Sequence, residues 1–509
     1  AGTDERARNG GAAMPLNYTS MEQVSGWRFL RHRQAVAIAR HSVRLVHDPS
    51  RNATASLLVG VVASVLIVGV CFIIAFFRPA GQVGQDPILA DRATGGLYVR
   101  VGDTVHPALN LASARLIAGT DANPTMVPLS EIRKMPMGPL VGIPGAPDDL
   151  VVTTPPDAGF GLCDHLGSTG VRAVPTVTAL IGTPELGTWA HPVNSPQTVL
   201  ASYGGQTYLV TDGHRSQIDL TDKPVTLALG IQAGTAQPAP LSRALYEALI
   251  PTGPLRVPDV PNPGGPVGYR TPALPAVSGS VIKSTDATGD PNYFVALPAG
   301  VQLIPETVAL IISNANLARQ PVLNADPATI AGLPQAVGFD VSMYPKGPLA
   351  LLDKAAEPVT CVLWQKGSGE SQAAVTTVSG RRLPIPVGAE SRVVTLVSGP
   401  DRGAANTVYI GADAPNFVQV TGAEPDSPRR ESLWWVSTSG VRFGVPTQAG
   451  GEEARTRDAL GLTAAPVPAP WSVIRWLPAG PTLSYAAAMS QHDTLIPDTP
   501  AKVLDKQGG

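Results

Sequence analysis

Three cysteines are the first residues of this chain whose chemistry could matter. They are Cys71, Cys163 and Cys361, and Cys163 is followed by Asp164 and His165. A zinc site at this point is poorly supported, because no second ligand pair with zinc spacing follows. A disulfide between Cys163 and Cys361 would close a loop of 198 residues, which the chain-entropy model credits with about 5 kcal/mol. A pair of free thiols is the alternative.

Other motifs give little support for catalysis. The nearest approach to a phosphate-binding loop is the segment 279–285, Gly-Ser-Val-Ile-Lys-Ser-Thr, in which Ile282 precedes Lys283. The motif needs Gly directly before Lys, so that backbone N–H groups can surround the phosphates. The chain has no G-x-S-x-G elbow and no H-E-x-x-H motif, and His492 beside Asp493 is a weak signal, because adjacent residues seldom face each other. We expect no catalytic residue, no metal and no cofactor.

The element that positions the rest of the chain is an uninterrupted apolar run from Leu57 to Phe77. About 20 apolar residues in a helix cross the ~30 Å hydrocarbon core of a bilayer, and a single span must be helical because lipid cannot satisfy backbone groups. A cleaved signal peptide is the competing interpretation. The run starts too late and is too long for one, and no A-x-A-like site follows it.

Charge predicts the orientation of this span. Residues 1–56 carry eight arginines and four acids, a formal charge of +4, whereas the whole chain is −2 and the remainder therefore about −6. The positive-inside rule then places the N-terminus in the cytoplasm and residues after 77 outside. A negatively charged external region also disfavours nucleic-acid partners.

The N-terminal segment 20–46 has a helical pattern. At 100° per residue, Arg33, Arg40 and Arg44 fall on one stripe, and Trp27, Ile38 and Leu45 fall roughly opposite, although Arg31 interrupts the apolar face. Three interpretations stay open. The helix docks on partner subunits through its apolar face, it lies on anionic lipid, or it is a solvated segment that only sets topology.

Beyond the span, short apolar runs alternate with turns. The chain has 52 Gly and 51 Pro yet 44 % hydrophobic residues, which predicts a folded α+β region of short strands. We expect strands at 97–101, 207–211, 308–312 and 392–396, and a helix at 241–249.

Self-comparison reveals a duplication. The segment 208–215 parallels 435–442, with Gly213 matching Gly440 and Arg215 matching Arg442. Further matches link 228–231 to 459–462 and 250–254 to 477–481, at near-constant offsets of 227 to 231 residues. Looser echoes occur at 97–106, 294–305 and 408–420. An array of small related lobes around a middle segment follows, and such arrays offer extended surfaces for partners.

We predict the following boundaries: a disordered N-terminus at 1–19, an amphipathic helix at 20–50, a transmembrane helix at 57–77, a first lobe at 86–160, a second at 161–260, a central domain with a third lobe at 261–360, a fourth lobe at 361–500 and a tail at 501–509. The fold class is a single-pass membrane protein with a large extracytoplasmic region of repeated small α/β lobes around a central domain.

Several segments resemble the EccB family, a core membrane component of mycobacterial type VII (ESX) secretion systems. They include Gln23–Leu30, Ile88–Arg92, Leu97–Asp103, His106–Ile117, Gly138–Pro147, Leu433–Val436 and His492–Leu495. The resemblance implies a disulfide between Cys163 and Cys361, and repeat lobes similar to a phage-endolysin cell-wall-binding fold. It also implies assembly with EccC-like, EccD-like and EccE-like subunits and a MycP-like protease in a hexameric inner-membrane complex.

The function predicted from residues and resemblance together is a structural core subunit that anchors in the inner membrane and builds the periplasmic assembly by oligomerisation. Two alternatives stay open: an ATPase, as some family labels state, and a module that anchors the complex to the cell wall.

Overall fold

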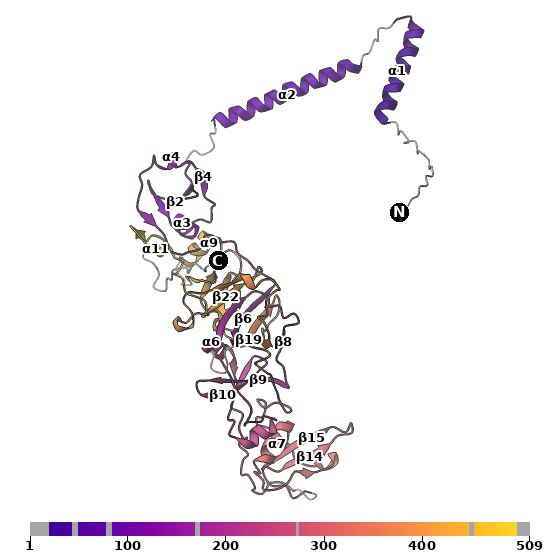
Figure 1. Cartoon of the computed structure of the whole chain (residues 1–509), viewed down its shortest axis with the longest axis vertical. Coiled ribbons are helices and arrows are strands. Elements are labelled where there is room, and N and C mark those ends of the chain that lie inside the picture. Colours follow the sequence, from indigo (N-terminus) through magenta and orange to yellow (C-terminus); the bar gives the residue numbers. More distant parts are fainter. Residues whose placement is uncertain are drawn as a thin grey trace, which may run out of the picture. The chain divides into compact units, whose positions relative to one another are not determined.

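The computed structural model describes residues 20–42, 49–77, 84–167, 174–270, 274–446 and 452–495 (Figure 1). The chain divides into two units, residues 1–82 and 83–509, and each is described by itself.

The first unit contains two helices, α1 (Met21–Arg40) and α2 (Pro49–Phe77). Helix α1 begins at a capping box, in which the Ser20 hydroxyl and the Gln23 side chain each accept a backbone N–H of the other residue. Helix α2 begins at a proline, the residue best tolerated in a first turn. Its apolar stretch Ala55–Ile74 is long and apolar enough to cross a membrane, since 20 residues at 1.5 Å each span about 30 Å. Arg44 and Leu45 lie outside the described residues.

The second unit contains a seven-stranded sheet and four smaller sheets (Figure 1). The strand order of the large sheet is β21-β22-β7-β6-β19-β20-β8. Its elements are β6 (Asp157–His165), β7 (Thr176–Ile181), β8 (Ala190–Pro192), β19 (Val359–Gly367), β20 (Ala374–Gly380), the 3₁₀ turn η1 (Glu390–Arg392), β21 (Val393–Thr395), the 3₁₀ turn η2 (Pro400–Arg402) and β22 (Thr407–Ile410).

Each small sheet belongs to one lobe. Lobe 1 contains β1 (Ile88–Asp91), β2 (Leu97–Val101), β3 (Thr104–Ala108), α3 (Leu111–Ala118), β4 (Thr125–Val127), α4 (Leu129–Ile132), β5 (Leu140–Val141) and β27 (Gln491–His492). Lobe 2 contains β9 (Gln197–Tyr203), β10 (Gln206–Thr211), β11 (His214–Ile218), α5 (Lys223–Ala228), β12 (Ala239–Pro240), α6 (Arg243–Ala248), β13 (Ile250–Pro251) and β18 (Ala350–Leu351).

Lobe 3 contains β14 (Val281–Thr285), β15 (Pro291–Leu297), β16 (Gly300–Ile304), α7 (Glu306–Asn314), β17 (Leu323–Asn324) and α8 (Pro327–Ala331). Lobe 4 contains β23 (Phe417–Thr421), β24 (Leu433–Val436), β25 (Arg442–Val445), α9 (Glu452–Leu460), β26 (Val467–Pro470), α10 (Trp471–Ile474) and α11 (Tyr485–Ala488).

All four lobes share one plan. Three antiparallel strands are followed by a helix and by a short strand that pairs parallel with the first strand, as β4 does with β1 and β26 with β23. A proline segment then runs beside the third strand. In lobe 4, Arg442 donates its N–H to the carbonyl of Pro478 and accepts the N–H of Gly480. The same pair of backbone hydrogen bonds joins Val105 to Pro136 and Gly138 in lobe 1. It also joins Val301 to Pro334 and Ala336 in lobe 3.

Glycine is required in two of these segments by the ring that lies against it. A Cβ on Gly138 would overlap the His106 ring, and one on Gly480 would overlap the Phe443 ring. In the matched segments 250–254 and 477–481 both glycines are closely packed, Gly253 against the Met343 side chain and Gly480 against the Phe443 ring.

Two sequence expectations are wrong. Residues 308–312, predicted as a strand, lie in α7, where Thr307, Val308, Ile311 and Ile312 are buried at helical spacing. The echo at 408–420 is not a repeat unit, because β22 joins the seven-stranded sheet and β23 begins lobe 4. In the first case an apolar run without polar alternation left the element type undetermined. In the second, two strands joined by a turn resemble a repeat unit, but they belong to different sheets.

The lobes are arranged as two related halves. Strands β6, β7 and β8 lead into lobe 2, and β19, β20 and β22 lead into lobe 4. The halves interlock, because β7 pairs with β22 and β20 pairs with β8. Lobes 2 and 4 pack on the same face of the sheet, where α6 contacts α10. Lobe 3 packs on lobe 2 through α7 and α5, and lobe 1 on lobe 4 through α3 and α9. The boundaries predicted from sequence stay predictions.

Candidate functional site

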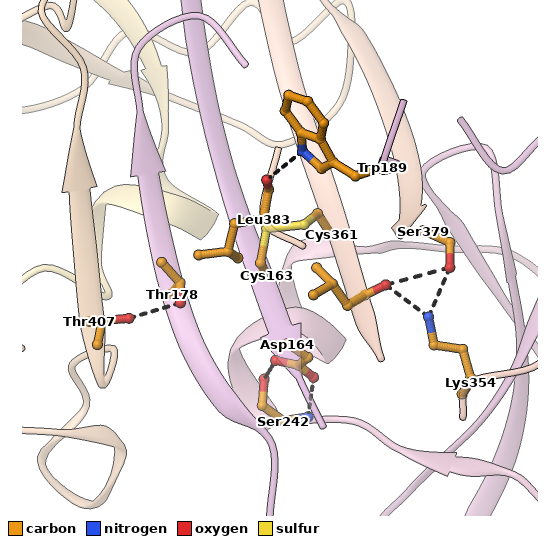
Figure 2. Close-up of a disulfide and its surroundings, with 11 residues drawn as sticks. Cys163, Asp164, Thr178, Trp189, Ser242, Lys354, Cys361, Ser379, Leu383 and Thr407 are labelled. Atoms are coloured by element: carbon orange, nitrogen blue, oxygen red, sulfur yellow. Dashed lines mark hydrogen bonds between the residues drawn. A yellow bond between two sulfur atoms is a disulfide. The ribbon is translucent and has the colours of Figure 1, made fainter. Parts of the chain in front are cut away.

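The disulfide lies at the centre of the seven-stranded sheet, where the two halves meet. Cys163 on β6 and Cys361 on β19 are directly opposite each other, with their Cα atoms 4.0 Å apart, and they are joined by an S–S bond (Figure 2). Both residues are fully buried. Cys71, the one free cysteine among the described residues, lies in α2. The bridge therefore joins β6 of the first half to β19 of the second half, near the centre of the sheet.

Both faces of β6 are covered. Cys163 packs with Leu180, Val378 and Ile385 on one face, whereas Phe160 and Leu162 face α6 and α10 on the other. The loop after β20 covers the disulfide and is held there by the Trp189 indole, whose Nε1 donates to the carbonyl of Leu383 at 3.0 Å (Figure 2). The bridge is thus shielded from reductants in solution.

Asp164, next to the disulfide, is a buried carboxylic acid. It accepts two hydrogen bonds from Ser242, the N-cap of α6: from the N–H at 2.7 Å and from the hydroxyl at 2.6 Å (Figure 2). Burial raises the pKa of Asp164 to about 7, although these hydrogen bonds and the charge of Lys354 act in the opposite direction. Asp164 thus ties lobe 2 to the sheet with a group that changes charge near neutral pH.

Lys354 fastens the segment after β18 to the same sheet. Its ammonium donates to the carbonyl of Val359 at 2.8 Å and to the Ser379 hydroxyl at 2.9 Å. Burial lowers the pKa of Lys354 to about 8, against the effect of neighbouring carboxylates such as Glu357. Neither Asp164 nor Lys354 was predicted from the sequence to be a buried ionisable group. For Asp164 the sequence carries little sign of burial, because β6 is covered on both faces and shows no polar alternation.

The repeated arginines occupy equivalent places in lobes 2 and 4. Arg215 donates to the carbonyl of Leu249, just after α6, and stacks 4.1 Å from the Tyr246 ring centroid. Arg442 donates to Leu477, just after α10, at 3.0 Å and lies 5.1 Å from the Trp471 ring centroid. A cation near the C-terminal end of a helix complements its dipole. The role of both arginines is therefore structural, a point that the sequence match alone did not reveal.

The predicted docking residues lie on α1. Trp27 is 58 % exposed and Ile38 is 74 % exposed, and helical geometry places Arg33 and Arg40 on the opposite side. The Arg31 guanidinium lies 4.8 Å from the Trp27 ring centroid. A cation over an aromatic ring is a favourable contact, so Arg31 packs against Trp27 on this side of the helix.

The phosphate-loop-like segment has a different structure from a phosphate loop. Lys283 lies within strand β14, and its ammonium lies 5.9 Å from the Tyr293 ring centroid. A phosphate loop instead leads from a strand into a helix.

His492 Nε2 lies 2.8 Å from the carbonyl of Gly142 and so supports the pairing of β27 with β5. Among the described residues, no group of three or more His, Cys, Asp or Glu side chains could hold a metal ion.

Comparison with known proteins covers nearly the whole chain. Residues 16–497 match the family model described as "Type VII secretion system ESX-1, transport TM domain B". A curated relative, the ESX-5 secretion system ATPase EccB5 of Mycobacterium tuberculosis, is 42 % identical over 502 residues, which cover 97 % of this chain and 98 % of the relative.

Solved structures agree. A chain of an intact ESX-5 inner membrane complex is 40 % identical, with a TM-score of 0.76, over 97 % of this chain and all of that one. A chain of the periplasmic assembly from the ESX-5 inner membrane complex is 43 % identical, with a TM-score of 0.73, over 83 % of this chain and all of that one. A chain of an EccB3 dimer from the ESX-3 core complex is 36 % identical, with a TM-score of 0.71, over 80 % of this chain and all of that one. This chain belongs to the EccB family of type VII secretion system membrane components.

Proposed function

We propose that the chain is a structural subunit of a type VII secretion complex in the inner membrane. The observation that carries the proposal is the match of nearly the whole chain, membrane helix included, to a component of an intact ESX-5 inner membrane complex. Residues 83–509 form interlocked halves with a central disulfide, an arrangement suited to a rigid framework outside the cytoplasm. In this proposal α1 lies in the cytoplasm.

The proposed partners follow the two units. Outside, the lobes bind a second copy of the chain and build a periplasmic assembly, as the dimer and the assembly of relatives suggest. Inside, α1 docks on the remaining subunits, which we propose to be EccC-like, EccD-like and EccE-like, and a MycP-like protease joins on the periplasmic side. The exposed Trp27 and Ile38 support docking, whereas the arginines opposite also suit anionic lipid.

The word ATPase in the names of relatives does not change the proposal. Lys283, the one lysine in a sequence resembling a phosphate loop, lies in a strand against Tyr293. We expect Lys283→Ala to leave secretion intact. Loss of secretion with normal assembly would argue for nucleotide chemistry.

Two experiments test the proposal. Gentle detergent extraction and affinity purification of the full chain should yield a large complex with several membrane subunits, and a lone protein would contradict the proposal. A reporter active only outside the cytoplasm should be active when fused after Gln85 and silent when fused before Arg51. The opposite pattern would overturn the assigned orientation.

A further inference from the structure

Among the residues that the structure describes, nothing protects one edge of the seven-stranded sheet. At the β8 edge, Pro192 removes a hydrogen-bond donor, and His191 pairs with Glu357 at 3.0 Å. At the β21 edge, the segment 393–397 reads Val-Val-Thr-Leu-Val, and Val394 and Val397 are 42 % and 46 % exposed. Natural proteins normally protect such edges with prolines, charges or a covering element.

Strand β21 also breaks the relation between the two halves. Residues 182–189 connect β7 to β8 in the first half, whereas residues 381–406, which include β21, connect β20 to β22 in the second. The nearest charged side chain does not guard the edge. Arg392 folds back, donating to the carbonyl of Ile410 at 3.0 Å and lying 5.6 Å from the Tyr409 ring centroid. The added strand is therefore left available to a partner.

The backbone of β21 is arranged for a further antiparallel strand. Leu396 donates its N–H to Asn406 on the β22 side at 2.8 Å. Because inward and outward groups alternate in an antiparallel ladder, the N–H and C=O of Thr395 point away from β22, as do the C=O of Val393 and the N–H of Val397. The N–H of Val393 is used within the 3₁₀ turn η1, where it donates to Glu390.

We propose that β21 pairs with β21 of a second copy of this chain, antiparallel, about a two-fold axis at Thr395. The inference rests on the proposed function, in which copies of the chain associate. Thr395 would exchange two hydrogen bonds with its counterpart, and Val397 of each copy would donate one to Val393 of the other. This edge is self-complementary, as a two-fold interface requires. Val394 faces Leu396 and Arg392 faces Ser398, so no like charges are opposed.

A single cysteine tests the pairing in the full chain within its membrane. The described external region has no free thiol, and Cα atoms in a hydrogen-bonded antiparallel pair lie about 5.5 Å apart, within the range of a disulfide. Thr395→Cys should convert most of the chain to a covalent dimer on a non-reducing gel, and reductant should reverse it. Ser371→Cys, at an exposed turn between β19 and β20, is the matched control and should remain monomeric.

The outcomes separate the inference from the proposed function. If Thr395→Cys stays monomeric in a complex that still assembles, or if Ser371→Cys forms equal amounts of dimer, the β21 pairing is wrong and the proposed function stands. If the parent chain enters no complex at all, the proposed function itself fails. As a second variant, Thr395→Pro removes only an outward N–H and should abolish the dimer on a native gel. A dimer that persists would also contradict the pairing.

Discussion

Asp164 makes the attachment of lobe 2 to the seven-stranded sheet sensitive to pH. The carboxyl keeps its proton up to about pH 7 in the folded chain, whereas its ordinary pKa is 3.8. Between these values the native state binds more protons than the unfolded state, so the contribution of Asp164 to stability falls as pH rises. It ties lobe 2 to the sheet through Ser242, and therefore the attachment of lobe 2 weakens toward neutral pH.

Asp164→Asn should remove this dependence. The amide can still accept from the Ser242 N–H and carries no charge, so the variant should match the parent near pH 4 and exceed it in stability at pH 8. At 1.36 kcal/mol per pKa unit, the gap between 3.8 and about 7 sets an upper bound of about 4 kcal/mol. Thermal unfolding of the full chain in detergent from pH 4 to 8 measures it. Asp401→Asn, at an exposed position, should not alter the pH profile, and parallel profiles for Asp164→Asn and the parent would refute the assignment.

The disulfide is the second prediction at this scale. Replacing Cys163 and Cys361 together with Ala should lower the free energy of unfolding by about 2–5 kcal/mol, because the unfolded chain loses its constraint. Urea titration monitored by tryptophan fluorescence measures the change, with Cys71→Ser as a control that should have no effect. Alkylation of the denatured, non-reduced parent should label neither Cys163 nor Cys361. Full labelling of both would show that the bridge does not form in the cell.

At the scale of elements, helix α1 exposes an apolar surface that includes Trp27 and Ile38. Trp27→Ala removes the largest apolar group on that surface, and large aromatic anchors dominate interface energies. We expect this variant to loosen the detergent-extracted complex on native gels. Neutralising Arg33, Arg40 and Arg44 together should matter less, since each contributes only about 1 kcal/mol near anionic lipid. An intact complex with Trp27→Ala would favour lipid binding over docking.

Arg442 contacts helix α10 as Arg215 contacts α6, through a carbonyl just after the helix and an aromatic ring. Arg442→Lys keeps the charge but loses the planar contact with Trp434 and Trp471 and the aligned donor to Leu477. We expect a loss of about 1–2 kcal/mol, measured as a lower thermal midpoint. Arg243→Lys, whose side chain is 64 % exposed, should have a much smaller effect. Equal effects of the two variants would contradict the capping role.

Sequence patterns predicted some elements well and others not at all. The strand at 97–101 and the helix within 241–249 are present, because alternation and a Ser242 cap are local signals. The two matched proline segments both contain a closely packed glycine, because a Cβ on Gly253 would overlap the Met343 side chain and one on Gly480 would overlap the Phe443 ring. The interlocking of the halves was beyond reach: the pairings of β7 with β22 and β20 with β8 join residues more than 180 positions apart. The position of β21 at an edge of the sheet could not be predicted either, because a strand predicted from sequence has no assigned neighbours.

At the scale of the whole molecule, lobe 1 depends on the far end of the chain. Strand β27 pairs with β5, and the Gly142 N–H donates to the carbonyl of Ser490 at 3.1 Å. A stop after Met489 should therefore destabilise lobe 1, raising hydrogen exchange of the β5 amides at least tenfold. A stop after Leu495 keeps β27 and is the matched control. Unchanged exchange in the shorter chain would show that lobe 1 is complete without β27.

The exchange of strands between the two halves also constrains the order of folding. Lobes 2, 3 and 4 are built mostly from neighbours in sequence and can form before the rest of the chain is available. Strand β6 cannot be completed until β19 arrives, about 200 residues later, and lobe 1 waits for almost the entire chain. Unpaired strands with apolar faces are prone to aggregation during such a delay. We expect a chain of this topology to need a chaperone while it folds, and its slowest step should be the closure of the central sheet.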